Sequence, residues 1–171
     1  MGTSKKSSKV SSISSKSSTG RSKKVKSGGK TTPKFYTTMP SEVHDEPWIS
    51  VERKKGKYPE PTENSGKWLV YVWNHNIDLV WEMISSATER GLLGFESKAS
   101  TAMPSPLAPK ENLGVICVYT YDFTDKEDVM RIREELRKIG VKNKIPYKAD
   151  KTTRALQYGF NTKGRVSLYY E

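Results

Sequence analysis

The residues best suited to bind a ligand form a basic and aromatic cluster near the C-terminal end of the chain. Tyr147, Lys148, Lys151 and Arg154 fall within eight positions and directly follow a short extended segment. Ammonium and guanidinium groups at this density can hold a phosphate through charge-assisted hydrogen bonds. The cluster therefore predicts a phosphate-binding surface. The alternative is a solvated loop whose positive charge Asp150 offsets.

A second candidate is the segment ESKAST at residues 96–101. On a strand, Glu96, Lys98 and Ser100 face one side of the sheet because successive side chains alternate. Polar groups at alternate positions can line a ligand cleft, with Lys98 as its cation. We therefore add Lys98 and Ser100 to the predicted ligand-binding residues, although an edge strand with one solvated face would show the same pattern.

Metal and catalytic chemistry has little support in the sequence. The chain has two histidines, His44 and His75, and one cysteine, Cys117, which lies inside an apolar strand pattern. This set is too small for a zinc site, and no glycine-rich phosphate loop is present. We therefore expect no metal and no cofactor. If the protein is an enzyme, the candidate catalytic residues are Lys98, Arg154 and His75.

The positive charge of the chain is concentrated in its first 34 residues. They contain ten of the 30 Lys and Arg residues and none of the 19 Asp and Glu residues, so residues 35–171 are nearly neutral. The segment is rich in Ser, Lys and Gly, which predicts a disordered basic tail able to contact nucleic acid nonspecifically. Its centre resembles a nuclear import signal formed by Arg21, Lys23, Lys24 and Lys26.

The sequence predicts an intracellular protein, cytoplasmic or nuclear, with no membrane partner. Its start lacks the apolar core of a signal peptide, no apolar run approaches the length of a membrane span, and a lone cysteine suits a reducing compartment. We expect three parts: the tail, residues 1–34; an extended, proline-containing lead-in, residues 35–65; and one domain, residues 66–171.

Two helices and several strands are predicted in that domain. Apolar residues recur at helical spacing over 77–90 and 129–139, and Thr124 with Glu127 forms a capping box before the second helix. Gly140 fits its C-terminal stop. Trp68 and Trp73 lie five positions apart on one strand, so they face opposite sides. The predicted strands are 67–73, 92–101, 115–121, 145–148 and 165–170, and 151–158 is a predicted short helix.

This order predicts an α+β fold with one mainly antiparallel sheet, helices on one face, and the other face available for ligands. The alternative is a ferredoxin-like sandwich, which has the same order of elements.

The chain also resembles the basophilic-leukaemia-expressed protein family, an uncharacterised family, over roughly residues 66–171. The resemblance rests on the segment that ends in Ser97-Lys98-Ala99-Ser100-Thr101, on Trp81 with the helix end after it, and on Ile145-Pro146-Tyr147-Lys148. It implies the fold of initiation factor 4E, a curved antiparallel sheet backed by helices. Some members carry the label phosphothreonine lyase, which would need a Lys base, a His acid and an Arg clamp.

We therefore predict a binding domain for a phosphate-bearing ligand, with RNA or a nucleotide as the expected ligand and the tail adding nonspecific affinity. Two alternatives remain at this point. One is a phosphothreonine lyase-like enzyme acting on a phosphate ester, and the other is an adaptor that binds a protein.

Overall fold

The computed structural model describes residues 38–104, 112–151 and 167–171. The chain divides into one unit of residues 1–34 and a second of residues 35–171, and all the elements below belong to the second. The predicted nuclear signal, the basic tail and Arg154 lie outside the described residues, as does most of the predicted helix 151–158. No helix in the described part is both long and apolar enough to span a membrane.

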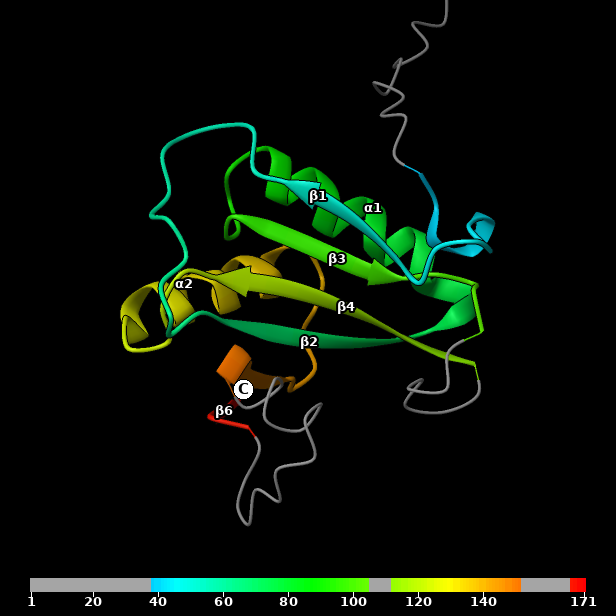
Figure 1. The fold of residues 1–171 in the computed structure, drawn as a ribbon. Helices are drawn as coiled ribbons and strands as arrows, with labels where there is room; N and C mark the ends of the chain where they lie inside the picture. Colours follow the sequence, from blue (N-terminus) through cyan, green and yellow to red (C-terminus); the bar gives the residue numbers. More distant parts are fainter. Residues whose placement is uncertain (1–37, 105–111, 152–166) are drawn as a thin grey trace, which may run out of the picture. The chain divides into compact units, whose positions relative to one another are not determined.

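One curved sheet of six strands forms the centre of the second unit, and its strand pairs are antiparallel (Figure 1). The strand order is β1-β3-β4-β2-β5-β6. Their bounds are β1 Trp48–Glu52, β2 Gly66–Trp73, β3 Glu96–Ser100, β4 Leu113–Thr120, β5 Pro146–Ala149 and β6 Tyr169–Tyr170. Two single-turn 3₁₀ helices, η1 Pro40–Glu42 and η2 Asn74–Asn76, complete the set together with two α-helices.

Both α-helices, α1 Ile77–Glu89 and α2 Lys126–Lys138, pack against the same face of the sheet. Their apolar residues recur at helical spacing and join inward-facing strand residues in one core. From the helices the core takes Ile77, Trp81, Ile84, Ala87, Val129, Ile132 and Leu136, and from the strands it takes Trp68, Val70, Val72, Ala99, Ile116, Val118 and Tyr147. The predicted α+β fold with helices on one face is confirmed.

The start of α2 corrects the predicted capping box. The N-cap is Asp125, whose side chain accepts a hydrogen bond from the backbone N–H of Asp128. Thr124 instead donates to Asp122 at 2.6 Å. The correction has a simple cause, since both residues are good N-caps and only the path of the preceding loop decides between them. At the other end Gly140 adopts a φ of 111°, the positive value predicted for a helix stop.

The inner four strands contain two split βαβ units. Strand β4 lies between β2 and β3, which α1 connects, and β2 lies between β4 and β5, which α2 connects. The ferredoxin-like alternative, which was inferred from the order of elements, contains split βαβ units of this kind. Strands β1 and β6 extend it on both sides into the wider curved sheet.

Three element predictions differ from the structure. The lead-in contains a strand, β1, which pairs with β3 and so belongs to the domain. The predicted strand 92–101 shortens to Glu96–Ser100, and Gly91 before it has a φ of 77°. The last strand is Tyr169–Tyr170, while part of the predicted range 165–170 lies outside the described residues.

Candidate functional site

The face of the sheet that lies opposite α1 and α2, called the open face from here on, is the candidate site. Alternation along each strand and the cross-strand register assign its residues. On β2, for example, Trp68 points to the helices and is fully buried, whereas Trp73 points to the open face and is 55% exposed. The prediction that these two tryptophans face opposite sides is confirmed. The open face carries Trp48, Ser50, Glu52, Lys67, Tyr71, Trp73, Glu96, Lys98, Ser100, Cys117, Tyr119 and Lys148.

Basic side chains gather around Tyr119 at one end of the open face. The ammonium groups of Lys67 and Lys98 lie 5.0 Å and 5.6 Å from the centre of the Tyr119 ring, so they flank the phenol from neighbouring strands. Lys148 stands directly opposite Lys67 across the β2–β5 pair. Burial raises the pKa of the Tyr119 phenol, which therefore stays protonated and able to donate a hydrogen bond.

The three lysines differ in whether their ammonium groups already have an ion-pair partner. Lys67 lies 2.9 Å from an oxygen of Asp150 in a pair that is largely shielded from solvent. Lys98 pairs with Glu96 at 3.2 Å and is more exposed. Lys148 has no ion-pair or hydrogen-bond partner for its side chain among the described residues. Lys148, followed by Lys98, is therefore the cation best placed to meet an incoming anion.

Exposed aromatic side chains occupy the other end of the open face. Tyr71 and Trp73 are two residues apart on β2, so they point the same way, and they are 42% and 55% exposed. Trp48 on β1 is 43% exposed and also belongs to this face. Flat aromatic groups left in solvent on a sheet are suited to stacking against bases.

Cys117 lies between these two regions, level with Lys98 on β3 and Leu69 on β2. Its side chain is buried, as expected, although it belongs to the open face and not to the helix-side core. Burial raises the pKa of the thiol to about 11. A protonated, buried thiol is a packing residue and not a nucleophile.

The structure places some of the predicted ligand residues together and separates others. Lys98, Ser100 and Lys148 all belong to the open face. The hydroxyl of Ser100 accepts a hydrogen bond from the backbone N–H of Val115 at 2.9 Å, so this residue stabilises the sheet. Lys151, two residues beyond the end of β5, donates to the side chain of Asn64 at 2.9 Å.

Tyr147 corrects the predicted cluster. It is fully buried on the helix side of the sheet, with its ring 5.1 Å from that of Trp68 and its hydroxyl 2.6 Å from that of Thr120. Lys148, the next residue, points the opposite way because side chains alternate along a strand. Tyr147 therefore cannot contact a ligand on the open face.

The residues named for an elimination reaction do not converge within the described part of the chain. Lys98 is level with Leu69 across β4, whereas His75 lies beyond the end of β2, past Trp73. The strand rise alone puts Trp73 about 13 Å from Leu69. Lys98 is also held in an ion pair with Glu96. Arg154, the proposed clamp, lies outside the described residues.

Sequence patterns did not indicate Lys67, Tyr71 or Tyr119 as site residues. The alternation of side chains along β2 and β4 could have indicated them. Once Trp68 and Val118 are assigned to the core, the residues next to them must point to the open face. Local patterns cannot predict that β2 pairs with β5, and it is this pairing that brings Lys67 opposite Lys148.

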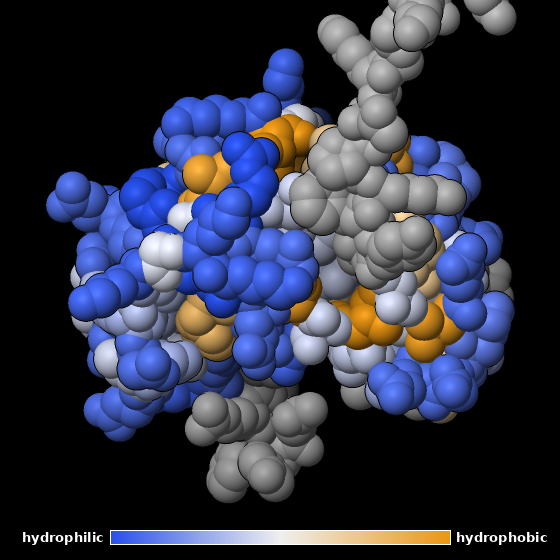
Figure 2. Space-filling view, turned by 90° about the horizontal axis from the view of Figure 1, so that it is seen from above, coloured by the Kyte–Doolittle hydropathy of each residue, from blue (hydrophilic) through white to orange (hydrophobic). Residues whose placement is uncertain are grey.

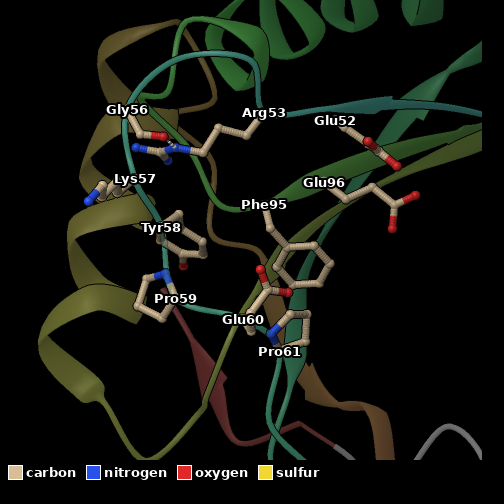
Figure 3. A pocket seen from close by; sticks show the side chains of 10 residues that line it. All are labelled: Glu52, Arg53, Gly56, Lys57, Tyr58, Pro59, Glu60, Pro61, Phe95 and Glu96. Atoms are coloured by element: carbon tan, nitrogen blue, oxygen red, sulfur yellow. Dashed lines mark hydrogen bonds between the residues drawn. The ribbon is translucent and has the colours of Figure 1, made fainter.

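A pocket of about 590 Å³ lies where β1 and β3 meet the loop after β1 (Figure 3). Glu52 and Glu96 are direct cross-strand partners at its edge, and Glu60 and Phe95 also line it. Two contacts hold the loop in place. The Arg53 guanidinium lies 4.9 Å from the centre of the Tyr58 ring, and the Tyr58 hydroxyl donates to Asp128 of α2 at 2.5 Å. These contacts fix the shape of the pocket, and carboxylates line one side of it.

No group of three or more His, Cys, Asp or Glu residues in the described part of the chain is arranged to hold a metal ion.

Comparison with known proteins gives a family and a set of similar folds. A family model described as "Basophilic leukemia-expressed protein Bles03" matches residues 60–155, which is more than half of the chain. Among solved structures, the chain is similar to schistosome eIF4E complexed with m7GpppA and 4E-BP, at 12% identity and a TM-score of 0.48, over 64% of this chain and 60% of that one.

A second schistosome eIF4E structure, complexed with m7GpppG and 4E-BP, matches at 12% identity and a TM-score of 0.47, over 64% of this chain. The matched part spans 59% of that protein's chain.

Proposed function

The chain belongs to the Basophilic leukemia-expressed protein Bles03 family, and within it we propose that the open face binds a phosphate-bearing ligand, a nucleotide or a short single-stranded RNA. One observation carries this proposal. One sheet face, which neither described α-helix covers, presents the ammonium groups of Lys98 and Lys148 at one end and the exposed rings of Tyr71 and Trp73 at the other.

The electrostatics of the basic end favour an anion. Lys67 and Lys148 stand directly opposite each other, and like charges in this position destabilise a strand pair by a few tenths of a kcal/mol or more. Asp150 offsets the charge of Lys67 but leaves Lys148 without a partner in the described residues. A phosphate beside Lys148 would relieve the repulsion and gain charge-assisted hydrogen bonds.

The geometry of the face favours a chain over a single nucleotide. Lys67 and Tyr71 are four residues apart on β2, about 13 Å by the strand rise. A mononucleotide with its phosphate at Lys148 would not reach the ring of Trp73. An extended single strand of a few nucleotides can place a phosphate at the basic end and stack bases on Tyr71 and Trp73.

The test compares aromatic variants of the full chain by fluorescence anisotropy with a labelled oligouridine of about ten nucleotides. The double variant Tyr71→Ala, Trp73→Ala should weaken binding about tenfold or more, since each stacked base contributes about 1–3 kcal/mol. Leu79→Ala is the matched control, because Leu79 is 60% exposed but lies on α1. The basic tail is identical in all three proteins, so its contribution cancels. Equal affinity of the double variant and wild type would contradict the proposal.

A further inference from the structure

Strand β1 is an edge strand of the sheet, and its outer backbone groups have no partner among the described residues. The backbone N–H of Arg53 donates to Phe95 at 2.9 Å, and that of Thr101 donates to Pro47 at 3.3 Å, so odd-numbered residues of this segment bond toward β3. In an antiparallel ladder the alternate residues then point outward. The N–H and C=O groups of Trp48, Ser50 and Glu52 therefore face away from the sheet.

No described segment covers this edge. The sheet ends at β1, and the backbone groups of Trp48, Ser50 and Glu52 have no partner beyond the β1–β3 pair in the described residues. Figure 1 shows β1 as the outermost strand on this side of the sheet. An uncovered edge of this kind is a template for an added strand.

The charge beside the edge specifies what kind of strand fits. Glu52 and Glu96 are cross-strand partners with side chains on the open face, and like charges so placed repel each other. Glu96 is offset by Lys98, whereas Glu52 and Glu60 have no ion-pair partner in the described residues.

The cations of the pocket do not neutralise these carboxylates. The guanidinium of Arg53 donates to the backbone carbonyls of Leu93 at 2.6 Å and Lys55 at 3.0 Å. In Figure 3 the side chain of Lys57 points away from Glu52 and Glu96. The pocket at the end of β1 therefore offers carboxylates and the ring of Phe95 to an incoming cation.

We propose that the β1 edge binds an extended basic peptide of a partner protein by strand addition, with a Lys or Arg side chain of the peptide entering the pocket beside Glu52. This proposal does not depend on the nucleotide-binding proposal, since it uses the backbone edge of β1 and the acidic pocket. A second copy of this chain fits less well, because β1 contains no basic residue and pairing two β1 edges would leave the carboxylates without a cation.

The register of β1 also predicts the spacing in the peptide. Trp48 and Glu52 point to the same face and are four residues apart. Side chains of an added strand lie opposite those of β1 on the same face. The best peptide therefore carries a basic residue opposite Glu52 and an apolar or aromatic residue opposite Trp48, four positions apart. Figure 2, which looks down on this side of the molecule, shows a hydrophilic surface interrupted by hydrophobic patches.

The experiment measures binding of a short fluorescein-labelled peptide to the full chain by anisotropy. The peptide has Arg and Phe four positions apart in a Thr, Val and Ser background, in both orders because the added strand can run in either direction. The comparison peptide has the same composition with Arg and Phe three positions apart, which places them on opposite faces of a strand. Binding of one order, with the comparison peptide at least about fivefold weaker, supports the proposal.

Two variants locate the interaction. Ser50→Pro removes an outward-facing N–H and leaves the pairing with β3 intact, so it should weaken peptide binding about tenfold while the protein keeps its cooperative unfolding transition in urea. Glu52→Gln should weaken binding about fivefold and reduce its salt dependence, and Glu82→Gln, an exposed change on α1, should not. A retained cooperative transition in urea denaturation shows that Ser50→Pro is folded, and Glu52→Gln tests the same site without a backbone change.

Three outcomes would overturn the proposal. The first is peptide binding that Ser50→Pro and Glu52→Gln both leave unchanged. The second is equal binding of the two peptide spacings, which would indicate attraction by charge alone. The third is a concentration-dependent dimer in sedimentation experiments that Ser50→Pro abolishes, since the edge would then serve a second copy of the chain.

Discussion

The hydroxyl of Tyr147 lies 2.6 Å from the hydroxyl of Thr120, in the buried layer between the sheet and the helices. Tyr147→Phe removes one partner of this hydrogen bond and leaves the other without one. We expect it to lower the free energy of unfolding by about 1–2 kcal/mol in urea denaturation, with no change in oligouridine affinity.

The double variant Tyr147→Phe, Thr120→Val is the matched control for this change. It removes both hydroxyls, so it should recover part of the loss, because an apolar pair leaves no buried group unsatisfied. A loss of oligouridine affinity in Tyr147→Phe at unchanged stability would return Tyr147 to the ligand site.

Cys117 makes the stability of the protein depend on pH in the alkaline range. Burial raises the pKa of its thiol from 9.0 to about 11, so the folded state holds this proton more tightly than the unfolded state. Stability is then fully present below pH 9.0 and falls as the pH rises toward about 11. Cys117→Ala should flatten this part of a plot of melting temperature against pH, whatever its effect on absolute stability.

Thiol modification gives an independent check of the same assignment. A disulfide reagent should react slowly with Cys117 in the native protein at pH 8 and quickly in denaturant, because only the exposed thiolate reacts. Rapid reaction of the native protein, or an identical slope in Cys117→Ala, would place the thiol in solvent and contradict its burial.

Single residues also show what the sequence could predict. The lysines at positions 98 and 148 were recognisable from charge and alternation, and both reach the open face. Tyr147 was wrongly grouped with Lys148 as a ligand residue. The two are neighbours in sequence, but successive side chains of a strand point to opposite faces of the sheet. Lys67 could not be chosen without the β2–β5 register, which depends on pairing between residues about 80 positions apart in the chain.

At the scale of elements, Arg133 joins α2 to the end of the sheet. Its side chain is fully buried and donates to three backbone carbonyls, those of Val141 at 2.9 Å, Asn143 at 2.6 Å and Glu171 at 3.0 Å. The guanidinium also lies 5.9 Å from the centre of the Trp68 ring. One charged group thus holds the loop after α2 and the strand β6 in place.

Arg133→Met should therefore destabilise the protein strongly. It leaves the carbonyls of Val141 and Asn143 without the Arg133 donor, whereas that of Glu171 keeps the backbone N–H of Ile145. Each buried unsatisfied group costs about 1–3 kcal/mol, so we expect a loss of about 3 kcal/mol or more in urea denaturation. Amide exchange should rise first in residues 168–171. Arg137→Met is the control, since its ion pairs with Glu134 and Glu171 lie at the surface and should contribute less than about 1 kcal/mol. Equal effects of the two variants would contradict a special role for Arg133.

The elements differ in how well local patterns predict them. Helix α2 was predictable because Val129, Ile132 and Leu136 repeat at helical spacing against a charged face. Strand β1 was not, because it is a short edge strand after Pro47, with only Ile49 and Val51 facing the core. An edge strand pairs on one side only, so the position of β1 depends mainly on its pairing with β3 and not on its own sequence.

At the scale of the whole molecule, the charge is divided unevenly along the chain. Residues 1–34 carry ten basic and no acidic residues, which leaves 20 basic and 19 acidic residues in 35–171. We expect the tail to supply most of the nonspecific, salt-dependent affinity for RNA, and the open face to supply the part that depends on individual lysines. These two contributions can be separated because the affinity of the tail depends on its total charge, whereas that of the open face depends on where its lysines lie.

The separating experiment measures oligouridine affinity across a salt series for two double variants with the same change in net charge. Lys98→Gln, Lys148→Gln alters the open face, whereas Lys142→Gln, Lys144→Gln alters exposed lysines of the loop after α2. The first should weaken binding and lower the slope of log affinity against log salt by about 1.4, because each phosphate of a single strand that a lysine neutralises adds about 0.7 to that slope. The second should change both quantities much less.

Deleting residues 1–34 from wild type and from both variants then isolates the tail. The salt slope should fall in all three proteins, because up to ten cations are removed, while the ratio of affinities between the two variants should stay the same. That constancy is the decisive quantity, since a tail and a face that bind independently contribute additive free energies. If the two double variants have equal affinities in both backgrounds, position on the open face has no influence, and RNA binding is a property of net charge alone.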